Sequence, residues 1–351
     1  MTHAYFADMG GFVLQTRVSK DAEWMVFPLD AKQVLYLVDN HYISYEEVCI
    51  EREVIKDKDK VDGILRLVIV LQISWYSIGC IARIYQHLTV TALELATLGF
   101  IFCSMGTYYF WFHKPMDVAR AITLMPAATI ADILCDAGDK AREPYRNTPM
   151  DFVYRDEWSW TRYWTHWKGI VRIVFHVNFD RTKRPIDKIP DDNFPHILGW
   201  PMWVLFIFQT GYGIVHLSGW TLPFPSHTER LLWHISTVTI MVCILGTWIV
   251  EVTAWRSPIA VMKKEKELDI EGNVGCSKRL LHRIAARMRN TTQPKDPEMS
   301  VPLRALIPVT LFGAIYWVAR LYVIVEGVVG LRALPPSAYD TVSWTAFLPH
   351  F

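Results

Sequence analysis

The sequence lacks the short motifs that identify several large enzyme classes. It contains no Walker A phosphate loop, no GxSxG nucleophile motif and no HExxH zinc motif. These absences argue against a P-loop nucleotidase, an α/β-hydrolase and a zincin protease. Cysteine is also scarce, with six residues in 351 and no pair at metal-ligand spacing. We therefore expect reduced thiols rather than a disulfide framework or a zinc site.

The sequence also lacks an excess of either charge. Its 36 Lys and Arg residues nearly balance its 35 Asp and Glu residues, and the formal net charge is +1. A nucleic-acid-binding protein would carry a basic surface, so we expect no nucleic-acid partner. The first residues show no basic stretch followed by an apolar core. We therefore expect no cleavable secretory signal.

The sequence does contain five long apolar blocks. Hydrophobic residues make up 52% of the chain, and 15 residues are Trp. The blocks cover residues 64–82, 90–112, 197–217, 231–252 and 303–325. Each approaches or exceeds the roughly 20 residues that cross a bilayer as a helix. The sequence therefore predicts an all-α integral membrane protein with five transmembrane helices and additional interfacial amphipathic helices.

Basic residues are distributed unequally between the segments that join these blocks. Segments 1–62, 113–196 and 253–301 carry 7, 13 and 10 Lys and Arg residues, whereas the intervening segments carry only Arg83, Arg230 and Arg332. The positive-inside rule then places the N-terminus in the cytosol and the C-terminus in the lumen or outside the cell. We predict an endoplasmic reticulum protein in which the single glycosylation sequon, at Asn290, stays unmodified on the cytosolic side.

The predicted organisation follows from these blocks and their sidedness. In chain order, we expect a cytosolic N-terminal segment (1–62), two transmembrane helices (63–112), a cytosolic connection with interfacial helices (113–196), two transmembrane helices (197–252), a basic cytosolic loop and helix (253–301), a fifth transmembrane helix (302–326) and a luminal aromatic tail (327–351).

Three stretches of the cytosolic segments are candidates for contact with the membrane surface. Residues 121–134 are apolar but too short to span and are interrupted by Pro126, so we expect them to lie in the interface or to re-enter. Residues 158–178 and 278–290 have amphipathic helical spacing, with Trp residues on one face of the first and basic residues around the second. The alternative for the first stretch is that its Trp residues line a binding pocket.

Ionisable residues cluster at the luminal ends of the predicted spans. Because a charge inside a membrane is costly, such residues are candidates for function. We expect six of them to be catalytic: Arg83, Glu94, His216, Glu229, Arg320 and Glu326. We expect Trp220, Tyr339 and Trp344 to line a substrate site beside them. A buried acid can donate a proton and aromatic faces can stabilise a carbocation, which would suit acid-initiated chemistry on a lipophilic substrate.

Other interpretations of the charged residues remain open. Ion pairs between Arg83 and Glu94 and between Arg320 and Glu326 could simply fix helix packing. Asp132, Asp136 and Asp139 have the spacing of one helix face and, with Asp187, Asp191 and Asp192, form an alternative site for Mg²⁺ and diphosphate in a prenyltransferase. His216 and His234 are an alternative pair for haem ligation.

Several local strings resemble a large group of fungal multi-pass membrane proteins. They are MGGF (9–12), IKDKDKVD (55–62), IARIYQHLTVTALELATLGF (81–100), YYFWFHKPMDV (108–118), GWTLPFPSHTERLLWHIS (219–236) and ARLYVIVEGVVGLRALPPSAYDTVSWTAFLPH (319–350). The chain is also similar to membrane-bound terpene and meroterpenoid cyclases of the ascochlorin and ascofuranone type. This resemblance implies protonation of a terminal epoxide or alkene of a farnesyl-type chain, followed by cyclisation without a metal or redox cofactor.

Under this hypothesis Glu94 is the leading acid, tuned by Arg83 and Arg320, and His216 or Glu229 is the terminating base. The partners would be a lipophilic small-molecule substrate and membrane lipids. The alternative is a non-enzymatic channel, transporter or scaffold, which would form a homo-oligomer with a polar path across the bilayer.

Overall fold

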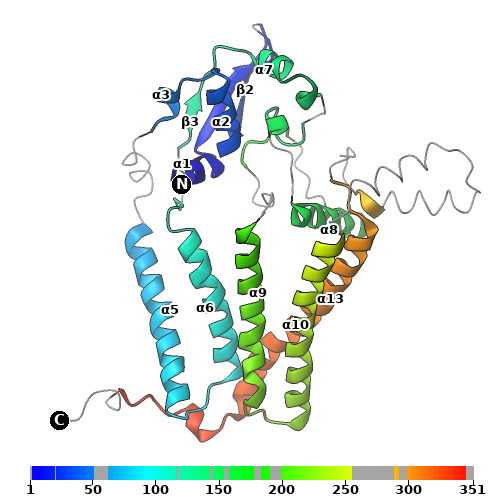
Figure 1. The fold of residues 1–351 in the computed structure, drawn as a ribbon. Helices are drawn as coiled ribbons and strands as arrows, with labels where there is room; N and C mark the ends of the chain where they lie inside the picture. The colour runs from blue at the N-terminus through cyan, green and yellow to red at the C-terminus, as the bar shows by residue number, and fades with distance from the viewer. Residues whose placement is uncertain are drawn as a thin grey trace, which may run out of the picture. The chain divides into compact units, whose positions relative to one another are not determined.

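The structure is a computed structural model, and the chain folds into two compact units that we describe separately (Figure 1). It describes residues 2–19, 21–50, 62–115, 118, 120–142, 145–153, 158–177, 183–189, 199–254, 288–291 and 299–344. The first unit, here the sheet unit, combines residues 1–65, 110–196 and 291–299. The second, here the helical unit, combines residues 66–109, 197–290 and 300–351.

The sheet unit contains short helices and three strands. Its elements, in chain order, are α1 (Thr2–Asp8), β1 (Phe12–Arg17), β2 (Trp24–Leu29), α2 (Ala31–Asp39), α3 (Tyr45–Val48), β3 (Ile122–Leu124), α7 (Ile130–Ala137), the 3-10 turns η1 (Gly138–Ala141) and η2 (Asp151–Val153), and α8 (Ser159–Phe175). The strands are ordered β2-β1-β3, with β1 antiparallel to β2 and parallel to β3. The expectation of an all-α protein is therefore corrected, because a small sheet is present.

The sheet forms because β1 alternates between buried and half-exposed residues. Phe12 and Leu14 point into the core, and Val13 lies opposite Pro28 of β2 and Thr123 of β3. This alternation is the pattern of a strand with one buried face. Pro28 cannot donate a ladder hydrogen bond, and it lies in β2, which is an outer strand of this sheet.

The apolar stretch 121–134 belongs to this core rather than to a membrane interface. It forms β3 and α7, in which Leu124 is 2% exposed and Ile133 is fully buried. The prediction that this stretch is interfacial or re-entrant was therefore wrong. Its apolar residues instead pack with Phe6, Phe27 and other residues of the N-terminal segment.

Helix α8 coincides with the predicted amphipathic segment. Its buried face combines small residues with Tyr163 and His166, and Gly169 lies so close to Thr291 that a Cβ there would meet the Thr291 hydroxyl at 2.2 Å. Arg172 donates a hydrogen bond to the Thr291 carbonyl at 2.9 Å. Its outer face exposes large apolar side chains, including Trp164 and Val174. The other predicted amphipathic stretch, 278–290, lies almost entirely outside the described residues.

The helical unit contains all five predicted spans, and each coincides with a helix. Its elements are α5 (Asp62–Tyr85), α6 (Ala92–Phe110), α9 (Trp200–Ser218), η3 (Gly219–Thr221), α10 (His227–Ala254), α13 (Leu303–Val329), η5 (Gly330–Ala333) and η6 (Pro336–Ala338). Among the described residues, three helical segments are long and apolar enough to cross a membrane: Ile64–Tyr85, His227–Thr253 and Leu303–Ala333. Helices α6 and α9 have 19 residues each.

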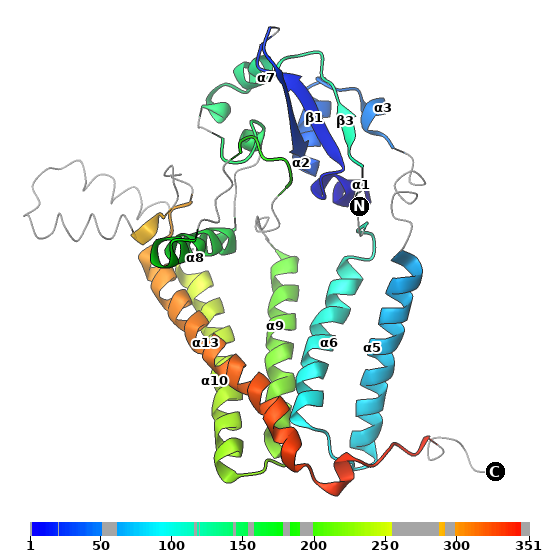
Figure 2. The ribbon, with the colours of Figure 1, turned by 180° about the vertical axis from the view of Figure 1, so that it is seen from behind.

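Helix α13 packs against several other helices of this unit. It packs along α10 and crosses it obliquely, as both views show (Figure 2). The core between the helices contains Trp233 and Ile240 of α10 and Val323 of α13, all fully buried. Helix α6 packs on α9 through glycines, because Gly106 lies against the Phe208 ring and Gly211 against the Phe102 ring. This packing brings residues of α6, α9, α10 and α13 close enough to form polar clusters.

Candidate functional site

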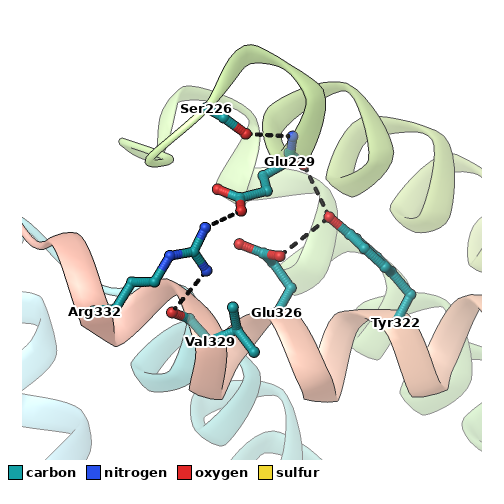
Figure 3. Close-up of polar contacts among 6 residues, drawn as sticks. All are labelled: Ser226, Glu229, Tyr322, Glu326, Val329 and Arg332. Atoms are coloured by element: carbon teal, nitrogen blue, oxygen red, sulfur yellow. Dashed lines mark hydrogen bonds and ion pairs between the residues drawn. The ribbon is translucent and has the colours of Figure 1, made fainter.

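The clearest polar cluster of the helical unit lies where α10 begins and α13 ends (Figure 3). The sequence Ser226-His-Thr-Glu229 has the spacing of a helix start. The Ser226 hydroxyl accepts a hydrogen bond from the Glu229 amide at 3.2 Å. Turn η5 follows α13 directly and returns Arg332 towards Glu229. We call Glu229, Tyr322, Glu326 and Arg332 the acid cluster.

Glu326 is the buried acid of this cluster. Only 4% of the residue is exposed, although a buried carboxyl group without a balancing charge is costly. Its Oε2 atom accepts a hydrogen bond at 3.3 Å from the hydroxyl of Tyr322, one helical turn earlier on α13. Its Oε1 atom is enclosed and has no hydrogen-bond partner among the described residues. One oxygen of Glu326 is therefore held in place while the other is unused.

Tyr322 contacts two acceptors with one hydroxyl group. It donates to the Glu229 carbonyl oxygen at 3.1 Å as well as to Glu326. A phenol has only one proton to donate, but its oxygen can accept. Both contacts become full hydrogen bonds if Glu326 Oε2 carries a proton and donates it to the Tyr322 oxygen. The geometry therefore accommodates a neutral Glu326 well.

Glu229, in contrast, has a cationic partner. Its Oε1 atom forms an ion pair with Arg332, which also donates to the Val329 carbonyl at 3.3 Å. Its Oε2 atom is enclosed without a hydrogen-bond partner in the part of the chain that the structure describes. Two carboxyl groups thus lie in one cluster with a single guanidinium. This arrangement favours one charged and one neutral carboxyl group.

Glu94 has a structural role that its sequence neighbours explain. Its Oε2 atom accepts hydrogen bonds from the Thr91 amide at 2.8 Å and the Thr91 hydroxyl at 3.1 Å. The Glu94 amide in turn donates to the Thr91 hydroxyl at 3.2 Å. This reciprocal pairing is a capping box at the start of α6. The carboxylate that was expected to be the leading acid therefore accepts the hydrogen bond of a backbone amide at the start of α6.

Arg83 and Arg320 do not form the expected ion pairs with Glu94 and Glu326. Arg83 donates to backbone carbonyl groups, namely those of Thr89 at 2.8 Å, Ala338 at 2.8 Å and Asp340 at 2.9 Å. It thereby ties the tail after η6 to the end of α5. Arg320 and Glu326 are six residues apart on α13, which places them on different helix faces.

Arg320 lies instead between α6 and α9. Its guanidinium carbon is 4.6 Å from the centre of the Phe100 ring and 4.4 Å from that of the Tyr212 ring. Its Nη1 atom is 3.4 Å from Nε2 of the fully buried His216. We call Phe100, Tyr212, His216 and Arg320 the arginine cage. The six predicted catalytic residues therefore occupy separate places: the acid cluster, the arginine cage, the α6 cap and the α5 end.

The three predicted substrate-binding aromatics have different neighbours. Trp220 stacks on His234 at 3.9 Å between ring centres, and Trp344 stacks on Trp75 at 5.0 Å. Tyr339 is 72% exposed. The stacking of His234, whose Nε2 atom also contacts the Trp220 carbonyl at 2.9 Å, leaves it unsuited to a shared haem with His216.

The predicted aspartate face does not form. Helix α7 ends at Ala137, and Gly138 follows with a φ of +57°, so Asp139 leaves the helical register of Asp132 and Asp136. Asp132 caps α7 through Thr129, with a hydroxyl contact of 2.7 Å. No group of three His, Cys, Asp or Glu side chains within the described residues could hold a metal ion. Of the proposed partner group, Asp187 is described, while Asp191 and Asp192 lie outside the described residues.

Asp136 instead forms a strong local hydrogen bond in the sheet unit. Its Oδ2 atom accepts from the Tyr42 hydroxyl at 2.6 Å. This hydrogen bond to a carboxylate raises the pKa of Tyr42 to about 12. The contact joins α7 to the N-terminal segment and so has a structural role.

Sequence reasoning passed over Tyr322, Tyr212 and Phe100. Tyr322 precedes Glu326 by four residues and Tyr212 precedes His216 by four, so each pair shares a helix face. That spacing was a usable signal, because an aromatic hydroxyl one turn away is within reach of an intramembrane acid or imidazole. Arg332 was noted only as one of the few luminal basic residues. Phe100 gave no signal, because its partner lies on another helix.

Comparison with known proteins gives a family but no activity. A family of unknown function (DUF8562) matches residues 1–135 and 202–351. No curated protein matches the chain. No solved structure matches it either. The matched residues include both strands of the β1–β2 hairpin, the whole of α5, α6, α10 and α13, all but the first two residues of α9, the acid cluster and the arginine cage. The chain belongs to the DUF8562 family of unknown function.

Proposed function

We propose that this protein is a membrane-embedded, cofactor-independent cyclase that starts the cyclisation of a lipophilic isoprenoid substrate by protonation, with Glu326 as the acid. The substrate class follows the resemblance to membrane-bound terpene and meroterpenoid cyclases. The observation that supports this assignment is the buried Glu326 carboxyl group, whose Oε1 atom has no partner among the described residues. Glu326 thus replaces Glu94, which caps α6, as the leading acid.

The environment of Glu326 suits a carboxylic acid that gives up its proton and recovers it. In the neutral state, Glu326 donates to the Tyr322 oxygen, as described above. After a proton passes to a terminal epoxide or alkene, the Tyr322 hydroxyl can turn and donate to the new carboxylate. The cyclised cation then loses a proton to Glu326 or to Glu229, so the product is an isomer of the substrate. No oxidant or reductant is consumed.

Arg332 has a supporting role in this proposal. By pairing with Glu229 it balances the charge of that carboxylate while Glu326 stays neutral. The cluster therefore separates the two carboxyl groups into a charged and an uncharged member, which is the usual arrangement of an acid with a nearby base. The ring of Tyr322, and those of Trp220 and Trp344 where the substrate extends to them, would stabilise the cationic intermediate.

The membrane location is part of the same proposal. Three apolar helices are compatible with a membrane protein, and we propose that α6 and α9 cross as well. Large apolar side chains on the outside of the helical unit support this, since Trp317 and Val318 of α13 are 71% and 74% exposed. A lipophilic substrate would reach the acid cluster through the bilayer. We propose the endoplasmic reticulum of a fungus as the location, with a cytosolic N-terminus.

The test compares two glutamate variants of the full chain in microsomes. Incubation with an epoxyfarnesyl substrate should give a product of unchanged mass, which chromatography with mass spectrometry detects. With the corresponding alkene-terminated farnesyl substrate in deuterated water, the product should gain one deuterium that does not exchange, because protonation then forms a bond to carbon. Glu326→Gln should lower turnover by at least about 100-fold, because it removes the acid and keeps the size. Glu94→Gln is the matched control, since glutamine also serves a capping box.

Two outcomes would contradict the proposal. Turnover by Glu326→Gln at the wild-type rate would remove Glu326 as the acid. A Glu94→Gln variant that loses activity while Glu326→Gln keeps it would return the role to Glu94. If wild-type microsomes convert no epoxyfarnesyl substrate, the cyclase assignment fails, and a channel, transporter or scaffold becomes the better interpretation.

A further inference from the structure

The arginine cage holds a cation that the described part of the chain does not neutralise. Arg320 is only 7% exposed, and no carboxylate pairs with it among the described residues. A buried unpaired charge is costly in any protein and more so within a membrane. The two aromatic rings compensate only in part, because each cation–π contact contributes about 0.5–2 kcal/mol. A negatively charged ligand in the cage would therefore stabilise Arg320.

The cage uses only part of the hydrogen-bonding capacity of Arg320. A guanidinium carries five N–H groups, which point outwards in its plane. Nη1 contacts His216 Nε2, whereas the other two nitrogens have no hydrogen-bond partner within the described ranges. The Phe100 and Tyr212 rings lie against the guanidinium carbon and do not consume N–H groups. N–H groups of the Arg320 guanidinium therefore remain available to donate hydrogen bonds to a bound ligand.

His216 orients the guanidinium without adding charge. Arginine can only donate, so His216 Nε2 must accept the contact from Arg320. The imidazole proton is then on Nδ1, which donates to the Tyr212 carbonyl at 2.9 Å. The Tyr212 hydroxyl also lies 3.3 Å from Nε2, so it shares the single lone pair of this atom with Arg320. The imidazole is therefore neutral, and the whole cage carries one positive charge.

We propose that the arginine cage binds the carboxylate of a long-chain amphiphile. A single positive charge matches a single negative charge, whereas a phosphate dianion would remain half uncompensated. The planar fork of a guanidinium fits the two oxygens of a carboxylate. The apolar chain has a surface to follow, because Phe100, Leu321 and Ile324 are 51%, 62% and 43% exposed. This site goes beyond the acid chemistry proposed at Glu326 and does not depend on it.

Gly99 keeps the cage in shape. A Cβ atom at this position would lie 2.9 Å from His216 Cε1 and 3.3 Å from Tyr212 Cε2. Any larger residue would therefore displace the two side chains that support Arg320. Glycine at position 99 allows α6 to approach α9 closely enough for Phe100 to reach the guanidinium.

Binding of oleate to the purified full chain in non-ionic detergent tests this site. Oleate should bind saturably, and oleyl alcohol, which has the same chain without the charge, should bind at least about tenfold more weakly. Arg320→Met should weaken oleate binding by at least about tenfold, and Arg320→Lys should recover only part of it, because an ammonium group lacks the planar fork. Arg304→Met, an exposed arginine near the start of the same helix, is the matched control.

The outcomes separate this site from the proposed enzyme. Glu326→Gln should bind oleate like the wild type even where it has lost turnover. Equal affinity for oleyl alcohol and oleate in the wild-type protein would overturn the proposal without the need for any variant. Unchanged oleate binding by a monodisperse Arg320→Met protein would also overturn it. If Arg320→Met does not purify in a folded state, the proposal is tested by oleate binding to Arg320→Lys and by the comparison of oleate with oleyl alcohol in the wild-type protein.

Discussion

At the scale of single residues, His166 of α8 shows how burial without a partner makes stability depend on pH. The residue is 5% exposed, and its Nδ1 atom has no hydrogen-bond partner among the described residues. Burial lowers the pKa of this imidazole below its ordinary value of 6.5. The folded protein therefore holds His166 neutral at a pH where the unfolded chain would be protonated.

The sign of the effect follows from proton binding. Above pH 6.5 the imidazole is neutral in both states and makes no pH-dependent contribution. As pH falls below 6.5 the unfolded state binds a proton and the folded state does not, so the free energy of unfolding decreases until the lowered pKa is reached. The slope from one group is at most about 1.4 kcal/mol per pH unit.

Thermal unfolding of wild-type protein and a His166→Gln variant between pH 7.5 and 5 checks this prediction. Glutamine is similar in size and does not titrate, so the variant should lose less stability over this range. An identical pH dependence in both proteins would show that the acid sensitivity comes from other groups. His41 is exposed and has a left-handed backbone that asparagine also adopts, so His41→Asn provides a control for the replacement of a surface imidazole.

The two glutamates Glu94 and Glu326 show what sequence can and cannot resolve at this scale. Both were predicted at the luminal ends of spans, and depth alone cannot distinguish them. The pattern Thr91-x-x-Glu94 is a capping-box signature that local sequence already contained. Glu326 has no ion pair among the described residues because Arg332 pairs with Glu229 instead. That contact joins residues 103 positions apart. Contacts of that kind follow from the fold and not from local spacing.

At the scale of elements, α6 and α9 pack through reciprocal contacts in which a glycine of each helix lies against a phenylalanine ring of the other. A Cβ atom at Gly106 would lie 2.3 Å from the Phe208 ring, and one at Gly211 would lie 2.5 Å from the Phe102 ring. The two phenylalanine rings are themselves 5.1 Å apart. Small residues that admit a neighbouring side chain are typical of helix contacts in membranes, where no hydrophobic gain drives helices together.

This packing predicts a large difference between two glycine substitutions. Gly106→Val should destabilise the helical unit by about 1–3 kcal/mol, because the added side chain must displace the Phe208 ring. Gly79→Val on α5 is the matched control, since a Cβ there meets no atom within 4 Å, and its effect should stay within about 0.5 kcal/mol. Thermal unfolding in detergent measures both. Phe208→Ala should rescue Gly106→Val, and a failure to rescue would contradict the contact.

The elements themselves were predictable to different degrees. All five long helices follow from long apolar blocks with few charged residues, which are the strongest signal that a sequence carries. Strand β3 was missed because it has only three residues and pairs with β1 more than 100 positions earlier, whereas β1 and β2 are a local pair that the emphasis on long apolar blocks passed over. Its neighbour α7 is short as well, so the stretch 121–134 looked like a broken membrane segment. The short length of this stretch and its Pro126 led to the prediction of a membrane interface, whereas its apolar residues fill the core of the sheet unit.

At the scale of the whole molecule, the placement of basic residues and the number of helices make one combined prediction. Five crossings put the two termini on opposite sides of the membrane, and the segments with 7, 13 and 10 basic residues then share the cytosolic side. The acid cluster and the tail that Arg83 holds would lie at the luminal ends of the helices. If α6 and α9 did not cross, three crossings would still separate the termini. They would not, however, keep the 113–196 and 253–301 segments on one side.

Glycosylation mapping in microsomes distinguishes these topologies. A sequon in an extension after Phe351 should be modified, and the modification should disappear on endoglycosidase treatment. Sequons in an extension before Met1, and in 10-residue insertions after Asp187 and after Glu271, should remain unmodified, like the native Asn290 sequon. Each insertion has a partner with Gln in place of Asn as its control. Modification after Asp187 but not after Glu271 would mean that α9 and α10 do not both cross, and the five-helix topology would then be wrong. A modified N-terminal extension would instead reverse the orientation, because the charge bias would then have failed to set it.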